Sequence, residues 1–331
     1  MFVSITIQTY NRSGMLAETL ESLRWLRRPA AVDYEILVVD NNSTDDTREV
    51  VQRHGRVLTP RLRSVFEPRQ GLSHARNRAL AEARGDIVSF LDDDVAVDPG
   101  WLEAVCEAFD KYEAAVVGGR AYLIYPTAAG RPAWLPESRE DLYSRLDHGP
   151  EPLVGTDKPL FGLNFSVLRR QALEVGGFDS AFGRCGRSLA CGEESDLLDR
   201  IRRAGGVVVY EPKAIVGHRV PPERLTKKWL LRRVYHGALS LEQLSIAQSG
   251  RPERMRTLLL YVLWCCGSTG KALLWGWRVS PECLFEKQCY VAGNLGRLVG
   301  TARSTWGIKR ARRRAAPVRD RDRIRDRSWR R

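Results

Sequence analysis

Three adjacent aspartates, Asp92, Asp93 and Asp94, directly follow an apolar run over residues 86–91. Neighbouring carboxylates repel one another, so holding them together at the end of a buried strand is costly without a cation. A divalent metal such as Mn²⁺ or Mg²⁺ prefers oxygen ligands, would relieve this repulsion and would bridge the phosphates of a bound nucleotide. A solvated acidic turn is the alternative, but the buried strand before the triplet favours a metal site.

A second acidic group, Glu193, Glu194 and Asp196, opens a predicted helix over residues 193–204. Carboxylates crowded in this way can raise one another's pKa, which suits a general base that removes a proton from a hydroxyl. Acidic residues in a first helical turn also stabilise a helix through its dipole. The two roles are compatible, and the pattern favours catalysis.

The elements that must position these groups alternate between short apolar strands and helical patterns. This alternation is typical of an α/β fold with a Rossmann-like, mostly parallel sheet covered by helices on both faces. Ligands bind beyond the carboxyl ends of such strands, so the polar clusters at 9–12, 40–45, 69–77 and 92–94 are expected to meet in one crevice. Strands are predicted over 3–7, 35–40, 63–66, 86–91, 161–168 and 207–210, helices over 16–26, 73–83 and 193–204, and an irregular covering segment over 121–159.

The order and spacing of these motifs resemble glycosyltransferase family 2. The resemblance implies the GT-A fold and an inverting, metal-dependent transfer of a sugar from a nucleoside-diphosphate donor, with uridine as the expected base. It implies a glycan or lipid-linked acceptor in polysaccharide or glycoconjugate biosynthesis. The motifs are ITIQTYNRSGMLAETLESL from Ile5, VVDNNSTDDT from Val38, GLSHARNRAL from Gly71, GDIVSFLDDDV from Gly85, GGFDSAFG from Gly176 and GEESDLLDRI from Gly192.

On the donor side, the resemblance places Thr9 and Asp40 at the base and ribose. Asn11, Arg12 and Asp93 belong to the same donor-binding set. A turn or capping role for the aspartate at position 40 is the alternative.

Two further positions complete the donor side. Arg76 matches the arginine of the family's Ala-Arg-Asn element and is implied to pair with the donor diphosphate or base; a solvated helix arginine is the alternative. Asp92 and Asp94 match the ends of the family's DxD element, which assigns Asp92 to the ribose and Asp94 to the metal. His218 is a second candidate metal ligand, with a structural role equally open.

On the acceptor side, Glu194 takes the position of the base, with Glu in place of the commoner Asp. Glu193 and Asp196 are implied to orient it or to hold acceptor hydroxyls. Arg224 is a candidate to neutralise the departing diphosphate.

The overall charge raises other functions. The net charge is +13, but residues 309–331 hold twelve Lys or Arg against three Asp, so the body is only mildly basic. With an acidic crevice and without a nucleic-acid motif, a nucleic-acid-binding protein is disfavoured. A nucleotidyltransferase would share the nucleotide and the metal, but it usually carries a glycine-rich basic loop where this chain has QTYNRSG.

The chain is expected to divide into three parts. Residues 1–220 form the catalytic domain, with nucleotide-sugar binding in 1–100 and the acceptor side in 101–220; a helical region (221–308) and a basic disordered tail (309–331) follow. The segment 257–277 is long enough to cross a bilayer, but Lys271 interrupts it. Packing against the catalytic domain, peripheral membrane contact and a true span stay open. Because the N-terminus lacks a signal-peptide pattern, the expected location is the cytoplasm, with a peripheral position on the inner face of the membrane as the alternative.

Overall fold

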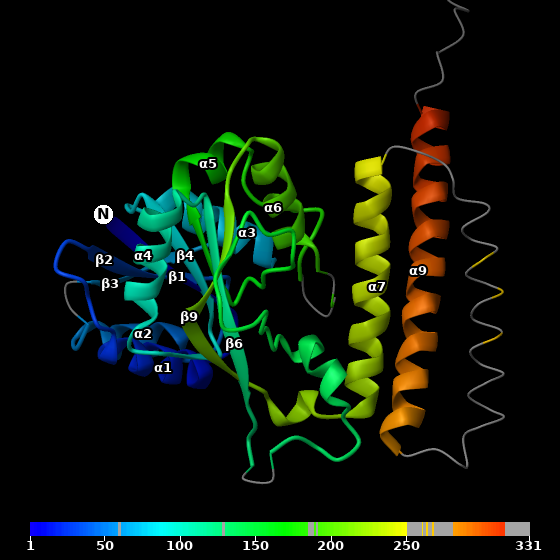
Figure 1. Ribbon diagram of the computed structural model, residues 1–331, viewed down its shortest axis with the longest axis horizontal. Helices are drawn as coiled ribbons and strands as arrows, with labels where there is room; N and C mark the ends of the chain where they lie inside the picture. Colours follow the sequence, from blue (N-terminus) through cyan, green and yellow to red (C-terminus); the bar gives the residue numbers. More distant parts are fainter. Residues whose placement is uncertain are drawn as a thin grey trace, which may run out of the picture.

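The chain folds into a nine-stranded mixed sheet flanked by helices, with two long helices beside it (Figure 1). The computed structural model describes residues 1–58, 61–127, 130–184, 189, 191–249 and 281–314, together with the isolated residues 260, 263 and 267. The α/β class and the helical C-terminal region predicted from the sequence are confirmed.

The first strands form where short apolar runs alternate with polar loops. The elements in this part are β1 (Phe2–Thr9), α1 (Ser13–Ser22), η1 (Leu23–Trp25), β2 (Asp33–Asp40), α2 (Thr47–Gly55), β3 (Leu62–Phe66), α3 (Leu72–Glu82) and β4 (Ile87–Asp92). The strands are parallel in the order β3-β2-β1-β4. The chain steps outward from β1 to β3 and then crosses back to β4. Right-handed crossovers therefore place α1 and α2 on one face and α3 on the other, as Figure 1 shows.

The second half of the sheet is mixed. Its elements are β5 (Val95–Val97), α4 (Trp101–Tyr112), β6 (Val116–Ile124), η2 (Glu137–Tyr143), β7 (Leu153–Val154), β8 (Asn164–Leu168), α5 (Arg169–Glu174), α6 (Glu193–Arg203) and β9 (Val208–Arg219). β8 pairs antiparallel with both β4 and β6, and β6 runs parallel to β9. The expected irregular segment 121–159 therefore begins inside a strand. The glycine pair and the bulge after Gly119 hide that strand from a periodicity argument.

The main core fills the space between the sheet and its helices. Val3, Ile5 and Ile7 of β1 are fully buried, as are the apolar residues of β2 and β4. This matches the near-continuous apolar runs expected of strands covered on both faces. The buried Trp101 at the start of α4 donates from its ring nitrogen to Asn164 of β8, at 2.8 Å.

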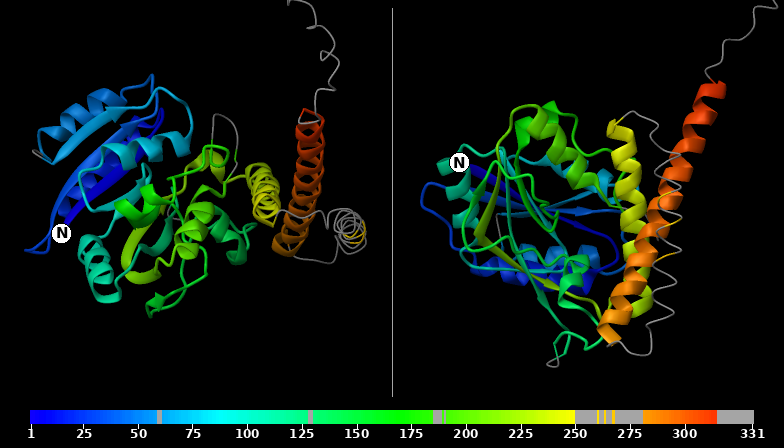
Figure 2. Two further views of the ribbon diagram at one scale, coloured as in Figure 1. Left: turned by 90° about the horizontal axis from the view of Figure 1, so that it is seen from above. Right: turned by 45° about the vertical axis from the view of Figure 1, so that its right-hand side comes forward.

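Two long helices, α7 (Lys227–Ser249) and α9 (Pro281–Arg314), follow η3 (Pro222–Arg224) and pack against each other beside the sheet (Figure 2). They run in the same direction, because Gly293, Gly296 and Gly300 of α9 face successively later residues of α7. A second apolar core joins this helical pair to η2, and its buried members are Leu135, Tyr143, Val220, Leu230, Phe285 and Cys289.

The C-terminal expectations are only partly accessible. No helix among the described residues is long and apolar enough to cross a membrane. The segment 257–277 lies outside the described residues, apart from three isolated positions. α9 ends at Arg314, inside the expected tail, and residues 315–331 also lie outside the described part of the chain.

Candidate active site

The carboxyl ends of β1, β2 and β4, together with the loop that leads into α3, bring residues of all four predicted polar loops together. Thr9 stands opposite Asp40 in the register of β1 and β2, and Asp92 stands opposite Gln8 across β1 and β4. These ends border a pocket of about 250 Å³. The pocket is lined by Gln8, Thr9, Tyr10, Arg12, Asn41, Gln70, Gly71, Leu72, Ala75, Asp92, Asp93, Arg184 and Arg224.

Arg12 is shared between the last two aspartates of the triplet. Its two terminal nitrogens lie 2.5 Å from Asp93 Oδ1 and 2.7 Å from Asp94 Oδ2. The hydroxyl of Thr9 donates to the other oxygen of Asp93 at 2.8 Å. Burial raises the pKa of Asp93 to about 7, although Arg12 opposes the shift. Asp93 is therefore bound by side chains of the protein itself. Asp92 is the most accessible aspartate of the triplet, with 32% of its side chain exposed.

Asp94 and His218 lie together beneath this pocket. His218 Nε2 is 3.3 Å from Asp94 Oδ2, and its Nδ1 is 2.6 Å from the backbone carbonyl of Tyr143. Because the carbonyl can only accept, Nδ1 carries a proton and Nε2 is directed at the carboxylate. Burial alone would raise the pKa of Asp94, but His218, Arg12 and Arg224 together hold it below its ordinary value.

These residues fit a divalent metal in part. Asp94 Oδ1 is buried without a hydrogen-bond partner, and an imidazole nitrogen lies beside the same carboxylate. No cluster of three or more His, Cys, Asp or Glu side chains able to hold a metal occurs in the part of the chain that the structure describes. Asp94 and His218 would therefore hold the ion with phosphate and water oxygens in its remaining positions, as Mg²⁺ and Mn²⁺ commonly bind at nucleotide sites.

Two predicted donor residues shape the loops instead of lining the pocket. Asp40 Oδ1 accepts the backbone N–H of Ser43 at 2.8 Å, and Asn11 Oδ1 accepts that of Thr44 at 2.7 Å. Asn11 has a positive φ of 50°, a conformation that asparagine tolerates better than most residues. Together these bonds tie the loop after β1 to the loop after β2.

Arg76 lies against the second acidic group and does not line the smaller pocket. The guanidinium is fully buried, with Nη1 at 3.1 Å from Glu193 Oε1 and 3.0 Å from Glu194 Oε1. Its Nη2 is 3.9 Å from Asp92 Oδ1. Gly162 passes so close that a Cβ there would overlap both Arg76 and Glu194. One buried cation thus joins the acidic motif to the triplet.

The two glutamates differ in access and in charge. The side chain of Glu193 is 3% exposed, and burial raises its pKa to about 7. Glu194 is 18% exposed; burial would raise its pKa too, but attraction to Arg76 is the main cause that lowers it below the ordinary value. Glu194 is therefore the ionised carboxylate of the pair at neutral pH, the state that a general base requires.

The remaining predicted residues occupy separate places. Asp196 pairs with Arg200 at 2.6 Å, and Arg200 also donates to the carbonyls of Val175 and Gly177, so this unit anchors the loop before α6. Arg224 lies 3.7 Å from Asp94 Oδ2 at the edge of the smaller pocket.

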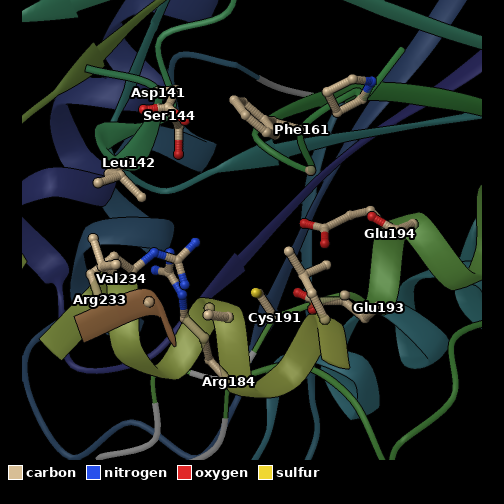
Figure 3. Close-up of a pocket in the computed structure, with 18 of the residues that line it drawn as sticks. Asp141, Leu142, Ser144, Phe161, Arg184, Cys191, Glu193, Glu194, Arg233 and Val234 are labelled. Carbon is tan, nitrogen blue, oxygen red and sulfur yellow. The ribbon is translucent and has the colours of Figure 1, made fainter. Parts of the chain in front are cut away.

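A larger cavity of about 910 Å³ lies between the acidic motif and the α7–α9 pair (Figure 3). It shares Leu72, Asp92 and Arg184 with the smaller pocket. Figure 3 shows Glu193 and Glu194 on one side and Arg184 and Arg233 on the other. Sequence reasoning missed these two arginines and Gly162, because no motif or periodicity marks them.

Comparisons with known proteins agree with this architecture. The family model described as glycosyl transferase family 2 matches residues 4–174. Succinoglycan biosynthesis protein ExoM of Rhizobium meliloti is 31% identical over 251 residues, covering 73% of this chain and 76% of that protein. The glucosyl-dolichyl phosphate glucuronosyltransferase of Haloferax volcanii is 28% identical over 243 residues, covering 71% of this chain and 74% of that protein.

Two solved structures share the GT-A fold at low sequence identity. The mannosyltransferase PcManGT from Pyrobaculum calidifontis, in complex with GDP-Man and Mn²⁺, superposes with a TM-score of 0.52 at 19% identity, covering 93% of this chain and 75% of that chain. GalNAc-T7 with UDP, GalNAc and Mn²⁺ has a TM-score of 0.53 at 20% identity, covering 73% and 51%.

Proposed function

The chain belongs to glycosyltransferase family 2 and is a glycosyltransferase; from this premise we propose an inverting, metal-dependent transfer of a sugar from a nucleotide-sugar donor to a glycan or lipid-linked acceptor. The observation that carries the proposal is the position of Asp92. It lies where the smaller pocket meets the larger cavity, and Arg76 links it to Glu194. A donor in the first space would present its sugar to an acceptor in the second.

The donor would occupy the pocket at the strand ends, with Thr9, Tyr10 and Asp92 around the nucleoside and ribose. Asp94 and His218 would hold the divalent metal, Mn²⁺ or Mg²⁺, which supplies Lewis-acid stabilisation of the diphosphate leaving group when bound. Arg224, at the edge of the same pocket, adds positive charge where negative charge develops. Two fold relatives were solved as complexes of Mn²⁺ with GDP-Man or UDP, which supports this class of donor.

Glu194 would accept the proton of the acceptor hydroxyl as its oxygen attacks the anomeric carbon. The bond between that carbon and the diphosphate oxygen breaks in the same displacement, so the configuration inverts. Arg76 holds the carboxylate ionised and pointed into the cavity. One relative is a succinoglycan biosynthesis protein, which supports a role in a polysaccharide or glycoconjugate pathway. We propose that this step takes place in the cytoplasm or at the inner face of the membrane.

A panel of nucleotide sugars tests the proposal. Donor binding and slow donor hydrolysis are measured with Mn²⁺ and with a chelator, for the wild type, Asp94→Ala and the matched control Asp86→Ala. Asp86 is exposed and precedes β4, at the opposite end of the strand from the triplet. We expect one donor to bind only with metal, Asp94→Ala to lose it and Asp86→Ala to keep it. Binding of no nucleotide sugar under any metal condition would refute the proposed function.

A further inference from the structure

Arg184 and Arg233 are the cavity arginines without a carboxylate partner. Among the described residues, neither forms an ion pair within 4.0 Å, whereas Arg12 contacts two carboxylates and Arg76 three. Arg233 Nη1 donates to the carbonyl of Leu189 at 3.0 Å, and its Nε is buried without any hydrogen-bond partner. Figure 3 shows both arginines on the side of the cavity opposite the glutamates.

The surroundings of Arg233 leave its charge uncompensated. Burial lowers the pKa of Arg233, and the neighbouring charge of Arg184 lowers it further. Glu193 and Glu194 oppose this shift, but each of them is paired with Arg76. Burial raises the pKa of the third nearby carboxyl group, Asp141, which disfavours its charged form. A buried cation without a close counter-ion is costly, so an anion entering here would gain both attraction and hydrogen bonds.

This anion site is separate from the donor pocket. The donor pocket has its own cations in Arg12 and Arg224, and Arg233 does not line it. Arg233 lines the larger cavity only. This is the same cavity into which the acceptor hydroxyl would enter to be deprotonated by Glu194. Arg184 lines both spaces and so stands between the two sites.

We infer that Arg233, together with Arg184, binds a phosphate or diphosphate group carried by the acceptor. The inference rests on the proposed function, since it places that group across the cavity from the base. The guanidinium fork matches phosphate oxygens in a two-point contact. Beside it, α7 contributes Val234, Ala238 and the half-exposed Leu241 to the wall, an apolar surface suited to a prenyl chain on the same phosphate.

Binding of simple phosphates tests the inference. The binding of farnesyl phosphate and glucose 1-phosphate is compared with that of farnesol and glucose by calorimetry. The donor site is first filled with Mn²⁺ and a saturating amount of the nucleoside diphosphate that corresponds to the donor identified by the panel. The variants are Arg233→Gln, Arg233→Lys, Arg184→Gln and the control Arg232→Gln, an exposed arginine on the same helix. We expect Arg233→Gln to weaken phosphate binding about tenfold or more. Arg233→Lys should lose less, and Arg232→Gln nothing.

The two phosphates identify the source of the group. Tighter binding of farnesyl phosphate assigns it to a lipid-linked acceptor, and tighter binding of glucose 1-phosphate assigns it to a soluble sugar phosphate. Equal binding of the neutral and phosphorylated compounds, or unchanged binding in Arg233→Gln, overturns the inference. The donor panel separates this from a failure of the proposed function, because Arg233→Gln should bind the nucleotide sugar as the wild type does.

Discussion

The proposed donor and acceptor sides of the site share one arrangement, an arginine bound by two adjacent carboxylates. Arg12 serves Asp93 and Asp94, and Arg76 serves Glu193 and Glu194. In each pair burial raises the pKa of the first carboxylate to about 7, while the second stays ionised. Repulsion between two close carboxylates raises the pKa of one of them above that of the other, which allows the two to have different roles.

The two pairs differ in what else reaches the ionised member. Asp94 is 2% exposed and is also approached by the imidazole of His218 and by Arg224, so together with Arg12 three side chains fix its position. Glu194 is 18% exposed, and among the described side chains its ion-pair partner is Arg76 alone. Asp93 and Asp94 form the closed pair, which is suited to hold a metal and a diphosphate. Glu193 and Glu194 form the open pair, which is suited to exchange a proton with a substrate.

Removing the ionised carboxylate of the closed pair should have the largest effect. We expect Asp94→Asn to lower kcat/KM at least about 10³-fold, because a metal ion contributes several kcal/mol to catalysis, and to flatten the Mn²⁺ dependence. Asp93→Asn should cost about 10–100-fold, as expected for a residue that supports a ligand, and should keep the metal response. Steady-state rates across a Mn²⁺ titration measure both. The reverse order would show that Asp93 is the metal ligand.

The open pair gives the next largest effect. Glu194→Gln should lower kcat about 10²–10³-fold, as loss of a general base does, with donor affinity unchanged. Glu193→Gln should cost less, because its side chain is only 3% exposed and so less open to an acceptor than that of Glu194. Single-turnover rates with a bound donor separate chemistry from binding. If Glu193→Gln is the variant that stops turnover, the base is the buried glutamate and the comparison between the pairs fails.

The arginine of the open pair should set the pH dependence. Arg76 favours the ionised form of Glu194, so Arg76→Met should raise the pKa of Glu194 and move the acid limb of the kcat/KM profile to higher pH. At pH values on the acid limb, where only a small fraction of Glu194 is ionised, raising its pKa by about one unit lowers activity about tenfold.

Two further variants guard against a folding defect. Arg76→Lys keeps the charge and should move the limb less. Arg78→Met removes an arginine that is 41% exposed on the same helix, and it should leave the profile unchanged. A folded Arg76→Met with an unmoved acid limb would contradict the assignment of Glu194 as the base.

The sequence predicted the paired carboxylates better than it predicted the arginines that bind them. Parallel strand ends meet at one edge of a sheet, so the loops after β1 and β4 were predicted to share a crevice, and the structure places Thr9 and Asp93 in contact. The arginines were assigned to the donor from the family resemblance alone. Crowded carboxylates require cations, but which cation arrives depends on tertiary contacts across more than 80 residues, as between Arg12 and Asp93.

Regions without a periodic pattern were predicted least well. The strand β6 is interrupted by Gly118 and Gly119, so its apolar residues do not alternate. The sequence predicts helices after residue 220, but it does not indicate that α7 would form a wall of the larger cavity. That wall depends on how two helices pack, which intrinsic propensity does not determine.

A change in the packing of α7 against α9 should lower stability and acceptor-side binding without loss of donor binding. Gly296 of α9 lies against the carbonyl of Tyr235 in α7, and an added Cβ would overlap that oxygen. We expect Gly296→Ala to separate the helices and to lower the free energy of unfolding by about 1–3 kcal/mol, the usual cost of overpacking. Gly293→Ala is the matched control, because its Cβ would meet Val234 at 3.4 Å, an ordinary contact.

Urea unfolding and two binding measurements test this separation between the sides. Gly296→Ala should weaken phosphate or acceptor binding, because Arg233 is displaced with α7, while the nucleotide-sugar affinity stays within about twofold, as for a site that shares no contacts with the change. Gly293→Ala should leave both affinities unchanged and should not destabilise the fold, since replacing a helical glycine by alanine stabilises a helix by up to about 1 kcal/mol. Equal losses of donor and acceptor binding in Gly296→Ala would mean that the helical pair supports both pockets, and that the two sides are one cooperative unit.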